Sequence, residues 1–285
     1  MFSPLHNALS MVALAGLIGS PAMGAALIYE PFDYSPGAFD NASQAGGTGL
    51  TGAWSGTGAS DQWDVTSGGL TFTGLSTTGN AASRISASGN SASTRSIDGA
   101  ALTSLTPANG MIFFTVLVQD TNFSSGNSNG AMMIVDGTLT GGAGDPLATG
   151  SLSGFGVSFN DLNVHAIVAA GAGSSNSAVL IPNAAGDDNT YLLLGQIDWV
   201  SAGNDTLTLY QVTDVNNPFG GASVSIQADI NQGNLSHLLL GSRQIETFDE
   251  IRFGLTVGDV GLIPEPSSLA LLGLGGLMIA RRRRG

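Results

Sequence analysis

The sequence contains neither cysteine nor lysine. Without cysteine, the chain has no disulfide bond, no thiolate ligand for a metal and no cysteine nucleophile. A folded form therefore has to be stabilised by a buried core, supplemented by a bound ion where one is present. The absence of lysine leaves arginine as the only strongly basic side chain.

Basic residues are few, and half of them lie at one end of the chain. Eight arginines stand against 21 acidic residues, which gives a net charge of −13. Four of the arginines are the adjacent residues 281–284, so the rest of the chain is more acidic still. Such a surface repels phosphate backbones and anionic lipids, which excludes a nucleic-acid-binding protein. It suits a protein that stays soluble outside the cell or takes up divalent cations.

Helical patterns are also missing. No stretch between residues 27 and 263 has sustained helical periodicity with capping residues. Glycine accounts for 42 of the 285 residues, and most of the acids are aspartate, which is common in turns. This composition favours many short strands joined by turns.

The clearest strand signal is the apolar, β-branched and aromatic run at residues 111–118, which predicts a buried central strand. Residues 191–200 and 206–212 flank a short polar turn and predict a hairpin. Alternating threonines predict a further short strand at residues 70–75. With the other short apolar runs, about a dozen strands are expected, and the sequence predicts an all-β antiparallel β-sandwich without helices.

Four different short motifs lie between residues 29 and 254. They are Tyr29 to Tyr34, Ile197 to Trp199 with Gly203 to Leu209, Asn217-Pro218, and Phe248 to Gly254. These motifs resemble the LamG-like, concanavalin-type jelly-roll domains of bacteria. The resemblance implies a jelly-roll sandwich, and its known members include sugar-binding modules, adhesion modules and structural sandwiches. It therefore implies a fold rather than an activity.

The N-terminus has the pattern of a secretory signal peptide. Residues 8–18 form an apolar core that is followed by helix-breaking glycine and proline. Small residues at Ala22 and Gly24 predict cleavage by signal peptidase before Ala25, with cleavage before Leu27 as an equal alternative. An uncleaved N-terminal anchor is the other alternative.

The C-terminus carries three features in order: Pro264-Glu265-Pro266, an apolar run at residues 267–280, and a basic cluster. The basic cluster, which would act as the membrane stop, consists of Arg281, Arg282, Arg283 and Arg284. As a helix, the apolar run would be about 21 Å long, which is shorter than the roughly 30 Å hydrocarbon core of a bilayer. Arginine side chains that reach the interface would make up part of the difference. The arginine cluster stays on the cytoplasmic side, which leaves the body outside the inner membrane.

This order of motif, apolar run and basic stop resembles the PEP-CTERM sorting signal, which is found on exported proteins of bacteria that make exopolysaccharide. The resemblance implies that a membrane transpeptidase, exosortase, cleaves near Pro264-Glu265-Pro266, so that the transmembrane helix holds the chain only transiently. A permanent single-span anchor is the alternative. The chain is thus expected to comprise a signal peptide (1–24), a β-sandwich (25–254), a linker (255–263) and the sorting signal (264–285).

Paired carboxylates suited to cutting a glycan are absent from the sequence pattern. On a strand at residues 247–253, Glu246 and Glu250 would share a face about 13 Å apart. Glycoside hydrolysis requires separations of about 5–9.5 Å. Asp249 would point to the other face, and Glu250 and Arg252 are expected to form an exposed ion pair. The sequence therefore predicts that the chain is not an enzyme and has no catalytic residues.

Other candidate sites have structural explanations. His165 and His237 each stand alone in an apolar strand, as packed histidines do. The glycine pattern at residues 47–52 lacks the preceding strand and following helix that a dinucleotide site needs. Aromatic residues that could stack on sugars are few, and most are expected in the core. They are Trp54, Trp63, Trp199, Tyr191 and Tyr210.

Calcium is the cofactor that the aspartate-rich loops suit best. Asp249 is expected to share a face with the core residues Ile251 and Phe253, and a buried carboxylate needs a partner. If the first and last strands pair, Glu30 or Asp33 comes close to Asp249. These three acids are therefore the candidate calcium ligands, and backbone N–H donors to Asp249 are the alternative.

The sequence as a whole predicts an exported, non-catalytic protein of the cell surface or exopolysaccharide matrix. Exosortase and signal peptidase are its expected processing partners, the inner membrane is a transient one, and a glycan is its candidate ligand. Two alternatives remain open: a calcium-stabilised carbohydrate-binding or adhesion module, and a glycan-cleaving jelly-roll enzyme.

Overall fold

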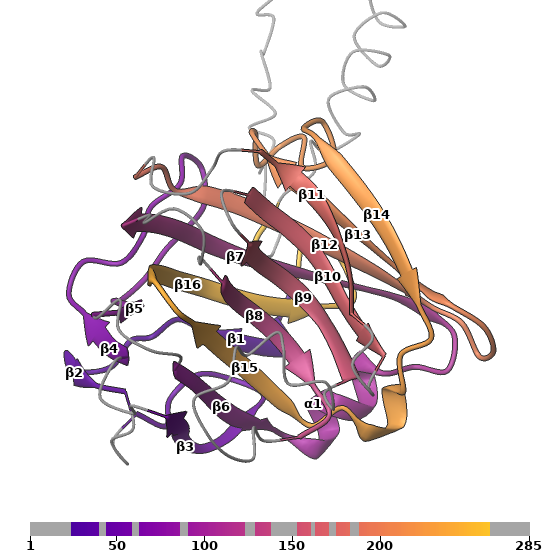
Figure 1. Ribbon diagram of the computed structural model, residues 1–285, viewed down its shortest axis with the longest axis horizontal. Coiled ribbons are helices and arrows are strands. Elements are labelled where there is room, and N and C mark those ends of the chain that lie inside the picture. Colours follow the sequence, from indigo (N-terminus) through magenta and orange to yellow (C-terminus); the bar gives the residue numbers. More distant parts are fainter. Residues whose placement is uncertain are drawn as a thin grey trace, which may run out of the picture.

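Antiparallel strands dominate the computed structural model, which describes residues 24–39, 44–58, 63–85, 91–122, 129–137, 153–160, 163–170, 175–182 and 188–262. The strands form two sheets that pack face to face (Figure 1). The chain is therefore an all-β antiparallel sandwich of jelly-roll type, as the sequence predicts.

The larger sheet has nine strands in the order β14-β13-β12-β7-β16-β5-β4-β2, and β1 pairs with β16 beside β5. Its strands are β1 (Ile28–Glu30), β2 (Gly37–Ala38), β4 (Trp63–Thr66), β5 (Ala81–Arg84), β7 (Gly110–Asn122), β12 (Tyr191–Trp199), β13 (Asp205–Val212), β14 (Ser223–Ala228) and β16 (Ile245–Gly254).

The smaller sheet has seven strands in the order β11-β10-β9-β8-β15-β6-β3. Its strands are β3 (Leu50–Gly58), β6 (Ser91–Ile97), β8 (Asn129–Val135), β9 (Ser153–Asn160), β10 (Asn163–Ala170), β11 (Ser175–Ile181) and β15 (His237–Ser242).

The main hydrophobic core lies between the two sheets, because side chains alternate along each strand and one set points inward. On β7 the inward set is Ile112, Phe114, Val116 and Val118, all without exposed surface. β7 pairs with β12 on one side and β16 on the other, which confirms the predicted central strand. β12 and β13 pair as the predicted hairpin.

The described residues include one short α-helix, α1 (Gly99–Leu105), and a single 3-10 turn (Gln232–Asn234), although the sequence predicts no helix. The Asp98 carboxylate caps α1 by accepting hydrogen bonds from the N–H groups of Ala100 and Ala101, at 2.9 and 3.4 Å. Seven residues are too few to produce a visible periodicity, so the expectation of no helix was wrong.

Residues 70–75 form a loop and not the predicted strand. Leu70 and Leu75 anchor this loop on the outer face of the nine-stranded sheet, where they belong to a second apolar cluster with Leu117 of β7. The alternation that predicted a strand reflects two buried loop anchors separated by exposed threonines.

β16 contains a bulge that changes which residues face the core. Its register with β7 shifts between Asp249 and Arg252, and Glu250 has a left-handed φ of 52°. An extra residue moves the side chains that follow it to the opposite face. Ile251 and Phe253 therefore face the core, while Asp249 faces away from it. The expectation that Asp249 shares their face is wrong because it assumed regular alternation.

The expected signal helix (1–24) and transmembrane helix (264–285) fall outside the described residues, apart from Gly24. Within the described ranges, no helix has the length and apolar character needed to cross a membrane.

Replacing Gly195 by alanine should destabilise the sandwich. Gly195 on β12 pairs with Phe114 on β7, and a Cβ atom there would collide with the Phe114 ring. Overpacking of this kind costs about 1–3 kcal/mol, which urea unfolding would measure as a lower midpoint. The matched control is Gly99→Ala, because a Cβ atom at Gly99 meets nothing within 4 Å. Equal midpoints for the two variants would contradict the packing argument.

Candidate functional site

Glu30, the first of the candidate calcium ligands along the chain, takes part in a buried ion pair. Glu30 on β1 points between the sheets, where its Oε2 lies 2.5 Å from Nη1 of Arg95 on β6. The Tyr34 hydroxyl donates to the same carboxylate at 2.8 and 2.9 Å, and the indole N–H of Trp54 donates at 3.3 Å. The amide N–H of Phe32 completes the shell at 3.0 Å. The carboxylate is thus fully engaged by groups that brace the two sheets.

The electrostatics of this pair agree with a structural role. Burial raises the pKa of Glu30, while Arg95, Tyr34 and the Phe32 amide oppose that rise. Arg95 itself also donates to the carbonyls of Gly52 and Gly46, at 3.0 and 2.5 Å. A cation already neutralises Glu30, so its carboxylate is not available to calcium.

The three calcium candidates do not converge. β1 and β16 do pair, as expected, but Glu30 faces the core, Asp33 is exposed, and Asp249 faces the outer side of its sheet. Asp249 accepts hydrogen bonds from the N–H groups of Leu70 at 2.8 Å and Glu250 at 2.7 Å. Within the described ranges, no three histidine, aspartate or glutamate side chains gather as a metal site. Glu30, Asp33 and Asp249 therefore do not meet at one point in the described structure, and backbone donors hold Asp249.

Glu250 and Arg252 form the expected ion pair, at 2.5 Å, but it is buried and not exposed. The loop between β4 and β5 covers the pair, and the N–H of Thr78 in this loop donates to Glu250 at 2.5 Å. The hydroxyl of Tyr29 on β1 also donates to Glu250, at 2.8 Å. Arg252 also donates to the carbonyl of Ser76 at 2.7 Å and lies over the Tyr29 ring, 4.8 Å from its centroid. These contacts fasten the loop to the sheet.

Glu246 lies on the opposite face of β16 from Glu250. It is fully buried between the sheets, directly across from Asp120 on β7. Its carboxylate lies against Gly130 on β8, where a Cβ atom would collide with both carboxylate oxygens. The expectation that Glu246 and Glu250 share a face is wrong, and the two carboxylates cannot flank one sugar bond.

Burial raises the pKa of Glu246 well above its ordinary value. The neighbouring Asp120 charge adds to this rise, while Ser242 and Arg84 oppose it. Burial also lowers the pKa of Arg84 to about 10. Glu246 is therefore an acid that the folded state prefers to keep protonated.

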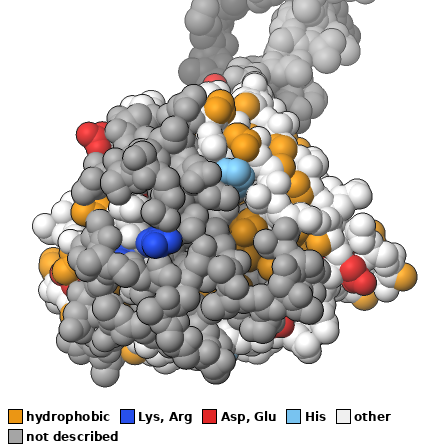
Figure 2. Space-filling view, in the orientation of Figure 1, with side chains coloured by type: hydrophobic (Ala, Val, Ile, Leu, Met, Phe, Trp, Pro, Cys, Tyr) orange, Lys and Arg blue, Asp and Glu red, His pale blue; other side chains and the backbone are white. Residues whose placement is uncertain are grey.

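The outer face of the seven-stranded sheet carries few groups that could do chemistry. The described residues that point outward from its strands are serines, threonines, asparagines, glycines, aliphatic side chains and two histidines. In Figure 2 the acidic side chains drawn in colour lie toward the margin, and a small basic patch lies further in. His165 stands beside Ser158 on the next strand. His237 shares hydrogen bonds with Ser96 and Ser236, at 3.2 and 2.8 Å, and burial lowers its pKa.

The tryptophan side chains offer no stacking platform. Trp54, Trp63 and Trp199 are all buried in the main core, as most were expected to be. Tyr210 is half-buried on the outer face of β13, where its ring contacts exposed Phe219 at 5.1 Å between centroids.

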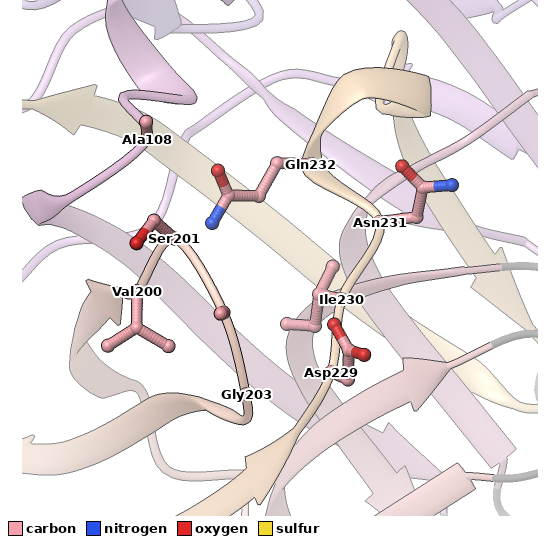
Figure 3. A pocket seen from close by; sticks show the side chains of 9 residues that line it. Ala108, Val200, Ser201, Gly203, Asp229, Ile230, Asn231 and Gln232 are labelled. Atoms are coloured by element: carbon pink, nitrogen blue, oxygen red, sulfur yellow. The ribbon is translucent and has the colours of Figure 1, made fainter.

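A hollow of about 490 Å³ lies between the β12–β13 turn and the segment after β14. Figure 3 shows Ser201 and Gly203 on one wall, with Asp229, Ile230 and Gln232 on the other. The rest of the lining is formed by Ala108, Val200, Ala202 and Asn231. The hollow is mostly polar and opens to solvent.

Asp205 holds both walls of this hollow in place. Its Oδ1 accepts hydrogen bonds from the N–H of Val200 at 3.0 Å and the side-chain amide of Gln232 at 3.2 Å. Its Oδ2 accepts from the N–H of Ile230 at 3.0 Å. Asp205 is 1% exposed, so its carboxylate is held by these protein groups. The sequence predicts a hairpin turn at Asp205 but gives no sign of the hollow, because Ile230 and Gln232 lie far away in sequence.

The predicted sorting and membrane-stop residues all lie outside the described residues, so their places in the structure stay predictions. They are Pro264, Glu265, Pro266, Arg281, Arg282, Arg283 and Arg284.

The described chain ends at Leu262, which is fully buried. The residues just before it, 255–262, fold against the nine-stranded sheet. The segment expected as a linker is therefore packed on the body.

Comparison with known protein families identifies one motif. Residues 262–284 match the PEP-CTERM protein-sorting motif. The match covers the C-terminal segment only, and it supports an exported protein that exosortase sorts. The matched range includes the expected sorting motif and the arginines Arg281, Arg282, Arg283 and Arg284. Among curated proteins, none matches this chain in sequence.

Several solved structures are similar in fold to the chain. They include an endo-β-1,4-glucuronan lyase from the fungus Trichoderma reesei (11% identity, 73% of this chain and 91% of that one, TM-score 0.41). An alginate lyase from Chlorella virus has 12% identity over 68% and 93% of the two chains, with a TM-score of 0.43. A carbohydrate esterase from the Shiga toxin-encoding bacteriophage phi24B has 13% identity over 81% and 99%, with a TM-score of 0.44. Likenesses this distant say nothing about activity.

Replacing Glu246 by glutamine should flatten the pH dependence of stability. Folding raises the pKa of Glu246. The stabilisation that the protonated carboxyl group adds to the free energy of unfolding is therefore complete below about pH 4.5 and is lost as the pH rises toward the folded-state pKa. Glu246→Gln has no charge to bury, so it should equal the wild type near pH 4 and exceed its stability at pH 8. Urea unfolding between pH 4 and pH 8 measures this. Asp33→Asn, at an exposed acid, is the control that should follow the wild type; parallel profiles for all three proteins would contradict the prediction.

Proposed function

We propose that the chain is an exported, non-catalytic component of the cell surface or exopolysaccharide matrix, sorted through its C-terminal signal, with a LamG-like body. The match of residues 262–284 to the PEP-CTERM motif carries this proposal. In the proposed sequence of events, signal peptidase removes the N-terminal segment, the C-terminal helix holds the chain at the inner membrane, and exosortase cleaves near Pro264-Glu265-Pro266.

The non-catalytic part of the proposal is supported by where the acidic groups lie. Glu30 and Glu250 are each tied to an arginine and to neighbouring hydroxyl and amide groups. Glu246 is enclosed between the sheets. Acid–base catalysis needs a carboxyl group within reach of a substrate proton. Glu30 and Glu250 are used for holding strands and loops together, and Glu246 has no exposed surface. On the outer face of the seven-stranded sheet, the titratable side chains among the described residues are histidines.

A second candidate function is the binding of a sugar unit in the hollow of Figure 3. The observation that favours it is the bracing by Asp205, which fixes a carboxylate, amide groups and a hydroxyl around one concave surface. Sugar hydroxyls both donate and accept hydrogen bonds, and preorganised polar groups lose little entropy when they bind them. In this proposal no calcium ion takes part.

Replacing Pro264, Glu265 and Pro266 together by alanine should block sorting. The expected result is accumulation of the full-length chain in the inner-membrane fraction of cells that contain exosortase, while the wild type yields a shortened body. Cell fractionation and intact-mass measurement distinguish the two. Ser267→Ala with Ser268→Ala, in the adjoining residues, is the matched control and should be processed normally. Normal shortening of the triple variant would contradict the sorting proposal.

Replacing Asp229 or Gln232 by alanine should weaken glycan binding if the hollow is a sugar site. We expect a loss of about tenfold or more, since an unpaired polar group in a binding site costs about 1–3 kcal/mol. A glycan array with purified wild-type protein selects the ligand, and calorimetry compares the variants with and without a chelator. Asp33→Ala is the control at an exposed acid on a different segment. Binding that disappears with the chelator, or that survives both substitutions, would contradict this second candidate function.

A further inference from the structure

The segment directly before the sorting motif is docked on the body. Residues 255–262, called the C-terminal strap here, follow β16 and turn back over the outer face of the nine-stranded sheet. Val257, Val260 and Leu262 are 9%, 0% and 0% exposed. They pack in one apolar cluster with outward residues of β7, β12 and β13 and with the loop anchors Leu70 and Leu75.

Hydrogen bonds hold the C-terminal strap in a folded shape. The Thr115 hydroxyl on β7 donates to the carbonyl of Val260 at 2.9 Å. Asp259 accepts from the N–H groups of Leu255 and Thr256, at 3.0 and 2.8 Å. The N–H of Leu262 donates to the carbonyl of Val257 at 3.1 Å. The strap is therefore a series of turns and not an extended peptide.

Close packing around Gly261 adds a steric element. Gly261 has a left-handed φ of 84°, and a Cβ atom on it would collide with Nη1 of Arg252. The guanidinium of Arg252 is itself fixed by Glu250 and the Ser76 carbonyl. The strap thus rests on the same buried ion pair that fastens the β4–β5 loop.

Leu262 belongs both to the docked strap and to the matched sorting motif, and a single residue separates it from Pro264. Enzymes that cut or transfer peptides hold their substrate as an extended chain whose backbone groups are free to pair. In the docked strap, the N–H of Leu262 and the carbonyl of Val260 are already paired, and both side chains are buried. A processing enzyme acting near Pro264 therefore lacks the residues it needs on the N-terminal side.

We propose that the C-terminal strap controls processing of the sorting signal: the folded body hides the residues before the motif, and cleavage proceeds only when the strap leaves the sheet. This inference rests on the proposed function, since it assumes that the motif is a processing site. Cleavage of a segment that opens transiently follows the population of its open form. The rate of sorting is then set by strap docking as well as by the motif.

The decisive variant inserts eight glycine and serine residues between Leu262 and Ile263 in the full chain. The insertion supplies an extended, accessible peptide while leaving the strap docked. In cells with exosortase, pulse–chase labelling should show processing at least about tenfold faster than in the wild type, the ratio expected when an opening step of about 1.4 kcal/mol or more is bypassed. The same insertion after Gly220, in the exposed turn between β13 and β14, is the control and should leave the rate unchanged.

A second measurement removes exosortase from the comparison. The recognition sequence of a soluble endoprotease replaces residues 264–266, and cutting is timed in purified full chains with and without the insertion. Faster cutting only with the insertion supports the strap proposal, and hydrogen exchange at Leu262 should stay slow in both chains. Equal cutting rates would overturn it, whatever exosortase does. Absence of exosortase cleavage in every chain, with the protease difference intact, would overturn the sorting proposal instead.

Discussion

The structure depends on β16, the strand that the rest of the nine-stranded sheet is assembled around. It pairs with β7 along most of its length and with β5 and β1 on its other side. Its bulge at Glu250 decides the destination of each side chain in the strand. Phe248, Ile251 and Phe253 enter the core, whereas Asp249 and Glu250 hold the β4–β5 loop. Core packing and loop attachment are therefore two results of one backbone irregularity.

The buried polar groups show how a chain without disulfides fixes its geometry. Three arginines of the body, Arg84, Arg95 and Arg252, are buried, and each contacts a carbonyl from a distant part of the chain. Such contacts add little net stability, because removing a charge from water is costly. Their effect is directional, since a guanidinium donates in a fixed plane. They specify where loops attach, while the apolar core supplies the driving force for folding.

Much of the fold could be read from the sequence, and most of the sites could not. The strand at residues 111–118 and the hairpin that follows Tyr191 stand out because their apolar runs have little interruption. The bulge at Glu250 leaves no such mark, so the faces expected for Glu246 and Asp249, on the near side of it, were wrong, while Ile251 and Phe253 beyond it lie in the core as expected. The partner of Glu30 was equally invisible, because Arg95 is brought to it only by packing of the two sheets. Asp98 is a residue type that often begins a helix, and it does cap α1, but α1 is too short to show a helical pattern of apolar residues.

The docking of residues 255–262 also determines how the body would respond to mechanical load. Any pull transmitted through the chain beyond Leu262 first has to peel the strap from the sheet. The force then runs along β16, whose hydrogen bonds to neighbours on both sides lie across the direction of pull. Resistance to forced unfolding is governed by the unfolding rate and not by equilibrium stability. A load applied beyond Leu262 thus meets the docked strap before it reaches a central strand of the sheet.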